Sequence, residues 1–362
     1  MKVSAPGKLF LSGEWAVLEP GNPGIVAAVN KRVHAELQPA KQGIQVSIDD
    51  FGILNLPFTW QRGMVAEGEV DEEKIKFLKA AVETSLRFLE EHDISFRPFS
   101  IKTWGDQSQV ILDGKTKKVG FGSSAASVVA VVAGVLKFHE YQATKEEIYK
   151  LAALVHYYAQ GKVGSAFDVA ASTFGGVFVY ERFQPDWLIA QATRPLKDIV
   201  ARDWPGLRID PLPAIQGLDL IVGWTKSSAS TSAMVKQLNI WAKDHQQEYH
   251  HAFGQIASLV KEVIDAWRAG DQERVLSLVR KNEPLLRELG QQAGVPIETP
   301  DLKQLSDLAN RAGGAGKLSG AGGGDCGIAL SFDPHVSDSI RIAWKAAGFY
   351  VIDTKIDWKG VE

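Results

Sequence analysis

Residues 120–126, Gly-Phe-Gly-Ser-Ser-Ala-Ala, come directly before an apolar stretch of helical length. A glycine turn that opens a buried helix leaves the first N–H groups of that helix without intrahelical partners and points the positive end of its dipole outward. Such an end binds anions, and phosphate above all. This segment therefore predicts a phosphate-binding loop, in which Gly120 and Gly122 allow close approach while Ser123 and Ser124 offer hydroxyls to phosphate or Mg²⁺. The alternative is a tight turn in which Ser123 is only the N-cap of a core helix.

A second glycine cluster lies at residues 319–325, Ser-Gly-Ala-Gly-Gly-Gly-Asp, and precedes an apparent strand at 326–332. Consecutive glycines let a backbone approach a ligand closely, at an entropic cost. A flexible surface loop is the alternative, but a glycine run beside a buried strand makes a poor linker. We therefore expect a ligand in a cleft between two glycine loops, one from each half of the chain.

Two charged residues have the chemistry that phosphoryl transfer requires, since that reaction depends on positioning and charge neutralisation. Asp168 opens a helix of small residues, where a backbone can lie close to a substrate. Lys8 follows a Pro-Gly bend near the start of a strand, from which its ammonium could reach the cleft. Each has a structural alternative. Ser165 and Asp168 have nearly the spacing of a capping box, and an isolated lysine is usually solvated.

Composition limits the class of protein. The chain has 362 residues, of which 45% are hydrophobic and 23% charged, which suits a globular enzyme of two domains or one large one. The net charge of −3 provides no general attraction to nucleic acid or to an anionic membrane, so phosphate recognition must be local. The only cysteine, Cys326, excludes an intramolecular disulfide and fits a reducing cytosol. No apolar stretch is long enough to cross a bilayer, and we expect a soluble cytoplasmic protein.

The elements that must position these residues follow from hydrophobic periodicity. In the first half we predict strands at 3–5, 8–11, 33–37, 45–48, 99–103, 109–112 and 175–180, and helices at 72–91, 127–136 and 145–158. After a proline-rich stretch we predict strands at 219–224, 326–332 and 349–353, and helices at 248–269, 272–289 and 300–312. This order indicates an α+β protein with an N-terminal domain over 1–183, a connector with some edge structure over 184–217 and a C-terminal domain over 218–362.

Three segments in this order resemble the motifs of the GHMP kinases: Pro6-Gly7-Lys8, residues 120–125 and residues 319–325. The resemblance covers nearly the whole chain. It implies a two-domain fold, with an N-terminal ribosomal-protein-like domain (a left-handed βαβ unit) and a C-terminal ferredoxin-like domain. It also implies that ATP and a small-molecule acceptor bind between the domains, with Mg²⁺ as cofactor, and it leaves a monomer and a homodimer equally open.

The resemblance further implies roles for individual residues. Lys8 and Asp168 would be catalytic: Asp168 faces the attacking group and Lys8 neutralises charge. Ser124 would hold Mg²⁺. The residues expected at the ATP phosphates are Gly120, Gly122, Ser123, Ser124, Ala125 and Lys118. The residues expected at the substrate are Ser165, Lys226, Ser227, Ser319, Gly320, Ala321, Gly322 and Gly323.

Three further segments, 13–21, 220–226 and 324–333, are most similar to family members whose acceptor is (R)-5-phosphomevalonate, although Trp15 stands where many relatives have Tyr or His. An acceptor phosphate is already anionic near neutral pH, because its second pKa is about 6. Asp168 could therefore position the substrate rather than act as a base. Two approaching anions require cations, and Lys117, Lys118 and Lys226 are the candidates.

Several alternatives stay open at this point. The hydroxyl run Ser227, Ser228, Ser230, Thr231 and Ser232 could bind the acceptor or form a solvated helix start. The chain could instead be a mevalonate kinase, another small-molecule kinase of this family or a related decarboxylase. A nucleotide-binding sensor without activity is a further reading, which the presence of Lys8, Ser124 and Asp168 disfavours.

Overall fold

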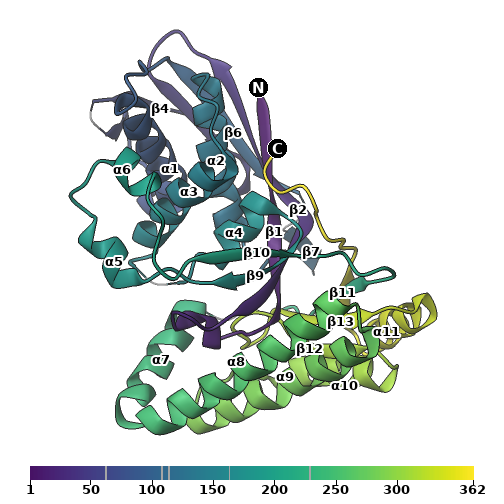
Figure 1. Cartoon of the computed structure of the whole chain (residues 1–362). Helices are drawn as coiled ribbons and strands as arrows, with labels where there is room; N and C mark the ends of the chain where they lie inside the picture. Colours follow the sequence, from purple (N-terminus) through teal and green to yellow (C-terminus); the bar gives the residue numbers. More distant parts are fainter. Residues whose placement is uncertain (62, 107–108, 113–114, 163, 228–229) are drawn as a thin grey trace.

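The computed structural model describes residues 1–362 except 62, 107–108, 113–114, 163 and 228–229, and it describes only the backbone of 109–112 and 115–118. Two lobes lie one above the other in Figure 1, each with its own sheet and its own helices. None of the helices in the described part of the chain combines the length and apolar composition needed to cross a membrane.

The N-terminal lobe is built on an eight-stranded sheet, in the order β10-β9-β2-β6-β3-β4-β5 with β1 paired to β2. Its strands are β1 (Lys2–Ser12), β2 (Gly24–Pro39), β3 (Ile44–Ile48), β4 (Ile53–Trp60), β5 (Met64–Ala66), β6 (Phe99–Gly105), β9 (Val177–Glu181) and β10 (Arg208–Leu212). Strands β7 (Gln109–Leu112) and β8 (Lys115–Lys118) form a separate hairpin. The helices are α1 (Glu72–Glu90), α2 (Ser123–Phe138), α3 (Lys145–Ala159), α4 (Phe167–Phe174), α5 (Pro185–Ala190) and α6 (Leu196–Val200).

The helix α2 is apolar on nearly every side, as expected for a helix enclosed by the core. It packs against β1 and β2 on one side and against α1, α3 and α4 on the others. The helix that starts at the predicted phosphate loop is therefore the central element of this lobe, and its N-terminus is held rigidly.

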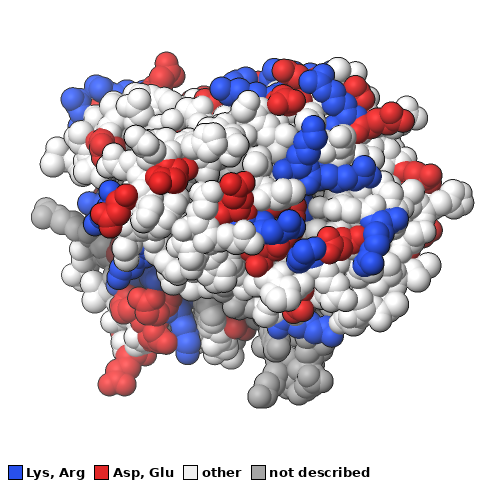
Figure 2. Space-filling model, turned by 90° about the horizontal axis from the view of Figure 1, so that it is seen from below, with Lys and Arg blue, Asp and Glu red and all other residues white. Residues whose placement is uncertain are grey.

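The C-terminal lobe has a four-stranded antiparallel sheet in the order β12-β13-β11-β14. Its strands are β11 (Asp219–Trp224), β12 (Ala315–Leu318), β13 (Cys326–Ser331) and β14 (Tyr350–Ile352). Its helices are α7 (Thr231–Asp244), α8 (Gln246–Ala269), α9 (Gln272–Ala293), α10 (Pro300–Arg311) and α11 (Pro334–Ala346). Among the described residues, basic and acidic side chains are intermixed on the face that Figure 2 shows.

The structure differs from the predicted elements in several places. Strands β4, β5, β8 and β12 and helices α7 and α11 were not predicted. The strand β1 continues through Pro6 and Gly7, where we predicted a break, because a register shift between these residues keeps both halves paired with β2. The proline-rich stretch 184–217 contains α5, α6 and β10. The strand β10 pairs with β9 at the edge of the sheet, where a proline such as Pro211 is tolerated.

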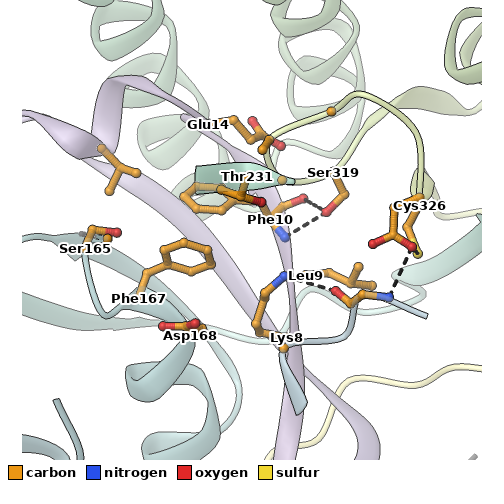
Figure 3. Close-up of a pocket in the computed structure, with 18 of the residues that line it drawn as sticks. Lys8, Leu9, Phe10, Glu14, Ser165, Phe167, Asp168, Thr231, Ser319 and Cys326 are labelled. Atoms are coloured by element: carbon orange, nitrogen blue, oxygen red, sulfur yellow. Dashed lines mark hydrogen bonds between the residues drawn. The ribbon is translucent and has the colours of Figure 1, made fainter. Parts of the chain in front are cut away.

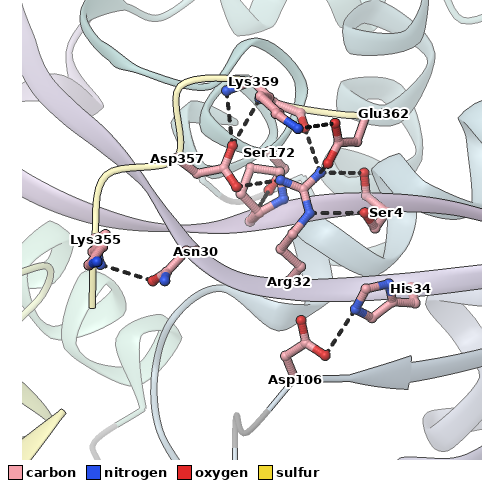
Figure 4. A network of polar contacts seen from close by, with 12 residues as sticks. Ser4, Asn30, Arg32, His34, Asp106, Ser172, Lys355, Asp357, Lys359 and Glu362 are labelled. Carbon is pink, nitrogen blue, oxygen red and sulfur yellow. Dashed lines mark hydrogen bonds and ion pairs between the residues drawn. The ribbon is translucent and has the colours of Figure 1, made fainter. Parts of the chain in front are cut away.

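The last residues of the chain return to the N-terminal lobe (Figure 4). Asp357 forms an ion pair with Arg32, and its N–H donates to the carbonyl of Ala28 at 2.9 Å. The N–H of Val361 donates to the carbonyl of Thr173 at 3.1 Å, near the end of α4. Residues 355–362 thus lie along the first domain, although we predicted a C-terminal domain over 218–362.

Candidate functional site

A cavity of about 480 Å³ lies where the two lobes meet (Figure 3). Many of the residues selected from the sequence line it together: Lys8, Gly120, Gly122, Ser123, Ser124, Ser165, Asp168, Ser319, Gly320, Ala321 and Gly322. Ala125, Gly323, Lys226 and Ser227 are not among the described residues that line it. Three motifs separated by more than a hundred residues each therefore converge on one cavity.

The predicted phosphate loop forms a helix N-terminus that is not closed by a side chain. Gly122 is the N-cap of α2 with a φ of 75°, and in the described structure no side chain accepts a hydrogen bond from the first turn. Ser123 is the first helical residue rather than the cap, so the N-cap alternative for Ser123 was wrong. A Cβ on Gly122 would lie 3.1 Å from the Lys8 side chain. The positive φ favours glycine here, and a side chain would also crowd Lys8.

The Lys8 ammonium is held at this loop. Its Nζ donates a hydrogen bond to the carbonyl of Gly120 at 3.2 Å and lies 5.8 Å from the centre of the Phe167 ring. The backbone N–H of Lys8 donates to the carbonyl of Phe121 at 2.8 Å. Strand β1 therefore fixes a positive charge beside the open N-terminus of α2, which is where an anion gains most.

Asp168 lies in the first turn of α4, on the same cavity (Figure 3). The capping box with Ser165, which was the structural alternative for these two residues, does not form, because Ala166 is the N-cap, in a left-handed conformation with a φ of 62°. One oxygen of Asp168, Oδ1, accepts from the N–H of Val169 at 3.0 Å. The Ser165 hydroxyl is buried and has no hydrogen-bond partner among the described residues. Asp168 thus satisfies one N–H of the first turn of α4 through Oδ1, whereas the Ser165 hydroxyl takes no part in capping.

The second glycine cluster is tied to β1 and to the loop before α10. The Ser319 hydroxyl accepts from the N–H of Phe10 at 2.9 Å and donates to its carbonyl at 3.0 Å. The N–H of Gly323 donates to the carbonyl of Ile297 at 2.9 Å. A Cβ on Gly322 would lie 2.0 Å from that carbonyl oxygen. The run of glycines is thus a packed turn beside the cavity and not a flexible linker.

Asp325, which was not among the predicted site residues, joins the two glycine loops. Its Oδ1 accepts from the N–H of Gly120 at 3.1 Å. Burial raises the pKa of Asp325, while the Gly120 N–H and the Lys8 ammonium act in the opposite direction. Its position directly after three glycines was the available signal, but the contact spans 205 residues and no local pattern predicts it.

The segment after β11 is only partly at the cavity. Ser230 caps α7, with its Oγ 3.3 Å from the N–H of Ala233, and Thr231 lines the cavity. The Ser227 hydroxyl lies 2.9 Å from that of Thr225. Lys226 has a left-handed φ of 65° in the turn between them. Ser228 and the side chains of Lys117 and Lys118 lie outside the described residues.

A group of buried charges lies behind the second loop. Lys317 forms an ion pair with Glu14, and both side chains are almost completely buried. Glu283 accepts hydrogen bonds from the N–H of Leu318 at 2.7 Å and from the Ser306 hydroxyl at 2.8 Å. Burial raises the pKa of Glu283 to about 7, although these donors and the Lys317 ammonium oppose the rise. The buried lysine next to Ser319 thus pairs directly with Glu14 and interacts electrostatically with Glu283.

A helix N-terminus, a fixed lysine and an aspartate on one cavity between two lobes are the parts that phosphoryl transfer requires. Models of the GHMP kinases N terminal domain and of the GHMP kinases C terminal region match residues 77–176 and 260–349. The chain belongs to the GHMP kinase family, and the predicted two-domain α+β fold is confirmed.

Phosphomevalonate kinases and mevalonate kinases are both among the similar proteins. The chain is 34% identical to a phosphomevalonate kinase of Streptomyces sp. (strain CL190), over 95% of this chain and 94% of that one. It is 28% identical to a mevalonate kinase of Thermococcus gammatolerans, over 99% and 96%. A structure of Streptococcus pneumoniae phosphomevalonate kinase, in complex with phosphomevalonate and AMPPNP, has a TM-score of 0.83 and 26% identity, and the match covers 98% of this chain and 99% of that one.

Proposed function

We propose that this chain catalyses the ATP-dependent phosphorylation of (R)-5-phosphomevalonate to 5-diphosphomevalonate, a step of the mevalonate route to isoprenoids. The observation that carries the proposal is the convergence of the α2 N-terminus, Lys8 and Asp168 on one cavity between the lobes. The similarity to the Streptomyces and Streptococcus enzymes supports this acceptor over others. The main alternative acceptor is mevalonate, since mevalonate kinases also match the whole chain.

In the proposed reaction an oxygen of the acceptor phosphate attacks the γ-phosphorus of ATP. The new P–O bond forms while the bond between the γ-phosphorus and the β–γ bridging oxygen breaks, and ADP leaves with that oxygen. Charge is the main obstacle, because both reactants are anions. The α2 N-terminus and the Lys8 ammonium offset this charge. An acceptor phosphate that is already ionised does not need a base to remove a proton. The role of Asp168 is therefore to orient the acceptor.

The residues at the cavity fit a Mg²⁺ ion shared with phosphates. Mg²⁺ prefers oxygen ligands and is usually held by one or two protein groups together with substrate phosphates and water. The Ser124 hydroxyl is the proposed protein ligand, with the Asp168 carboxylate near it. No cluster of three or more acidic, histidine or cysteine side chains able to hold a metal occurs among the described residues, which agrees with a shared site. When bound, Mg²⁺ would neutralise charge on the β- and γ-phosphates.

The acceptor can be identified by measuring ADP release with mevalonate, 5-phosphomevalonate and 5-diphosphomevalonate in turn. We expect turnover with 5-phosphomevalonate only. Turnover with mevalonate alone would reject this acceptor and leave the kinase class intact. Lys8→Met should lower kcat by at least about 100-fold while ADP binding changes little, because charge stabilisation by the ammonium acts mainly in the transition state. Asp168→Asn should lower kcat by about 100-fold because the acceptor loses its orientation. Unchanged kcat in either variant would remove that residue from the mechanism.

A further inference from the structure

Three helices of the N-terminal lobe meet behind the cavity at a buried histidine. His156 lies near the end of α3 and is 2% exposed. Its Nε2 lies 3.3 Å from the Ser124 hydroxyl, at the start of α2, and 3.8 Å from Oδ2 of Asp168, at the start of α4. His156 itself does not line the cavity among the described residues. One ring nitrogen is therefore adjacent to both the loop hydroxyl and the carboxylate of the site.

The imidazole ring is fixed in this position. It stacks on Phe77 of α1, with ring centres 5.3 Å apart and an angle of 25° between the planes. The side-chain amide of Gln160, one turn further along, lies 3.3 Å from the same Nε2. Burial and stacking prevent the ring from turning away, so Nε2 stays directed at the two helix starts.

The contacts on Nε2 orient the two groups that face the cavity. The Ser124 hydroxyl has one proton and two lone pairs. A hydrogen bond with Nε2 uses one of these positions and fixes the direction of the other two. For Asp168, the N–H of Val169 binds Oδ1 and leaves Oδ2 on the His156 side. At 3.8 Å this second contact is electrostatic and longer than a hydrogen bond. Without Nε2, both groups would lose their partner on the buried side.

We propose that His156 is a positioning residue that sets the distance and orientation between the Ser124 hydroxyl and the Asp168 carboxylate. This inference rests on the proposed function, since it assumes that Ser124 and Asp168 act on bound phosphates and Mg²⁺. His156 touches neither reactant and acts through the two side chains that do. Groups behind a metal or phosphate site characteristically change affinity or activity by about 10- to 100-fold when they are removed.

The test compares variants that distinguish the contribution of Nε2 from that of the stacked ring. His156→Phe keeps the stacking on Phe77 and removes Nε2, whereas His156→Gln retains a polar group at similar reach. We expect kcat to fall by about 10- to 100-fold in His156→Phe, with KM for the acceptor within about threefold, and His156→Gln to recover part of kcat. His139→Phe is the matched control. His139 is 4% exposed, lies at the other end of α2 and is distant from the cavity, so its replacement should leave kcat unchanged.

Calorimetry of ADP binding with and without Mg²⁺ provides a readout that needs no acceptor. The gain in ADP affinity that Mg²⁺ produces should shrink in His156→Phe and return in part in His156→Gln. This measurement holds whichever acceptor is correct, so it separates failure of this inference from failure of the proposed function. Wild-type kcat and an unchanged Mg²⁺ effect in His156→Phe would overturn the inference. So would equal losses in the Phe and Gln variants that track their melting temperatures.

If His156→Phe does not fold, His156→Gln and His156→Asn still decide the question. The glutamine side chain can reach the Nε2 position and the shorter asparagine cannot. Higher kcat in His156→Gln than in His156→Asn would support the inference, and the same or the reverse order would overturn it.

Discussion

Glu283 permits a quantitative test of the buried charges between the lobes. The residue is 3% exposed, and burial raises its pKa from 4.5 to about 7. The folded chain therefore keeps this proton to a higher pH than the unfolded chain does. By linkage, the free energy of unfolding must decrease as the pH rises through the window between about 4.5 and about 7. The ionised form is the unfavourable one, even with Lys317 nearby.

Replacing Glu283 by glutamine removes the titration and keeps an oxygen that can accept from the N–H of Leu318. One pKa unit corresponds to about 1.4 kcal/mol, so between about pH 5 and about pH 8 the wild type should lose on the order of 2 to 3 kcal/mol of stability relative to Glu283→Gln. Titrating groups that do not interact with Glu283 are common to both chains, and their contributions cancel in the difference.

The assay is urea unfolding followed by tryptophan fluorescence, at several pH values across this range. Glu288→Gln is the control, because Glu288 lies on the same helix α9 with an exposed side chain. Its stability relative to wild type should not vary with pH. A difference between wild type and Glu283→Gln that stays constant from about pH 5 to about pH 8 would refute the reasoning, since it would mean that Lys317 and the hydrogen bonds outweigh burial.

Two further substitutions test the convergence of distant segments. In Gly120→Ala the new Cβ would lie 1.6 Å from Oδ2 of Asp325, so this carboxylate must move and its hydrogen bond with the N–H of Gly120 is broken. We expect kcat with ATP to fall by at least about 10-fold because the position of the phosphate loop is no longer fixed. Gly254→Ala, in open space on α8, is its control and should not reduce kcat; equal activity of the two variants would contradict this reading. Arg32→Met removes the cation that pairs with Asp357, whose side chain is 9% exposed, so the free energy of unfolding in urea should decrease by about 3 kcal/mol. A loss below about 1 kcal/mol would show that the C-terminal segment is not held by this pair.

Local patterns were enough to predict most elements and the helix that starts at the phosphate loop. The stretch after Gly122 is apolar and uninterrupted, so its helix and its burial followed from composition. Capping was predicted less well. The spacing of Ser165 and Asp168 suggested a capping box, whereas Ala166 caps α4 in a conformation that sequence spacing does not reveal. Hydrogen-bonding capacity alone does not determine which residue caps a helix.

The site contacts that could not be predicted from the sequence join residues that are far apart in the chain. The Asp325–Gly120 hydrogen bond and the Lys317–Glu14 ion pair join residues separated by 205 and 303 positions. From the sequence alone, a lysine such as Lys317 is predicted to be exposed to solvent. Its burial depends on a partner that is distant in the chain. His156 is a similar case, since its partners Ser124 and Asp168 come from other helices.

Strand β1 explains how three distant motifs keep a common geometry. Residues on alternate positions of a strand face opposite sides. Leu9 and Leu11 accordingly pack in the core shared with the C-terminal lobe, and Phe10 packs in the core of the N-terminal lobe.

The same strand contacts all three elements of the site within five residues. The carbonyl of Pro6 accepts from the Ser172 hydroxyl of α4 at 2.7 Å, the N–H of Lys8 binds the phosphate loop, and Phe10 binds Ser319. A Cβ on Gly7 would lie 2.7 Å from the carbonyl oxygen of Phe121, so a side chain there would force the strand away from the loop. The glycine before the lysine is thus required by the packing of β1 against the phosphate loop, and the position of the ammonium depends on it.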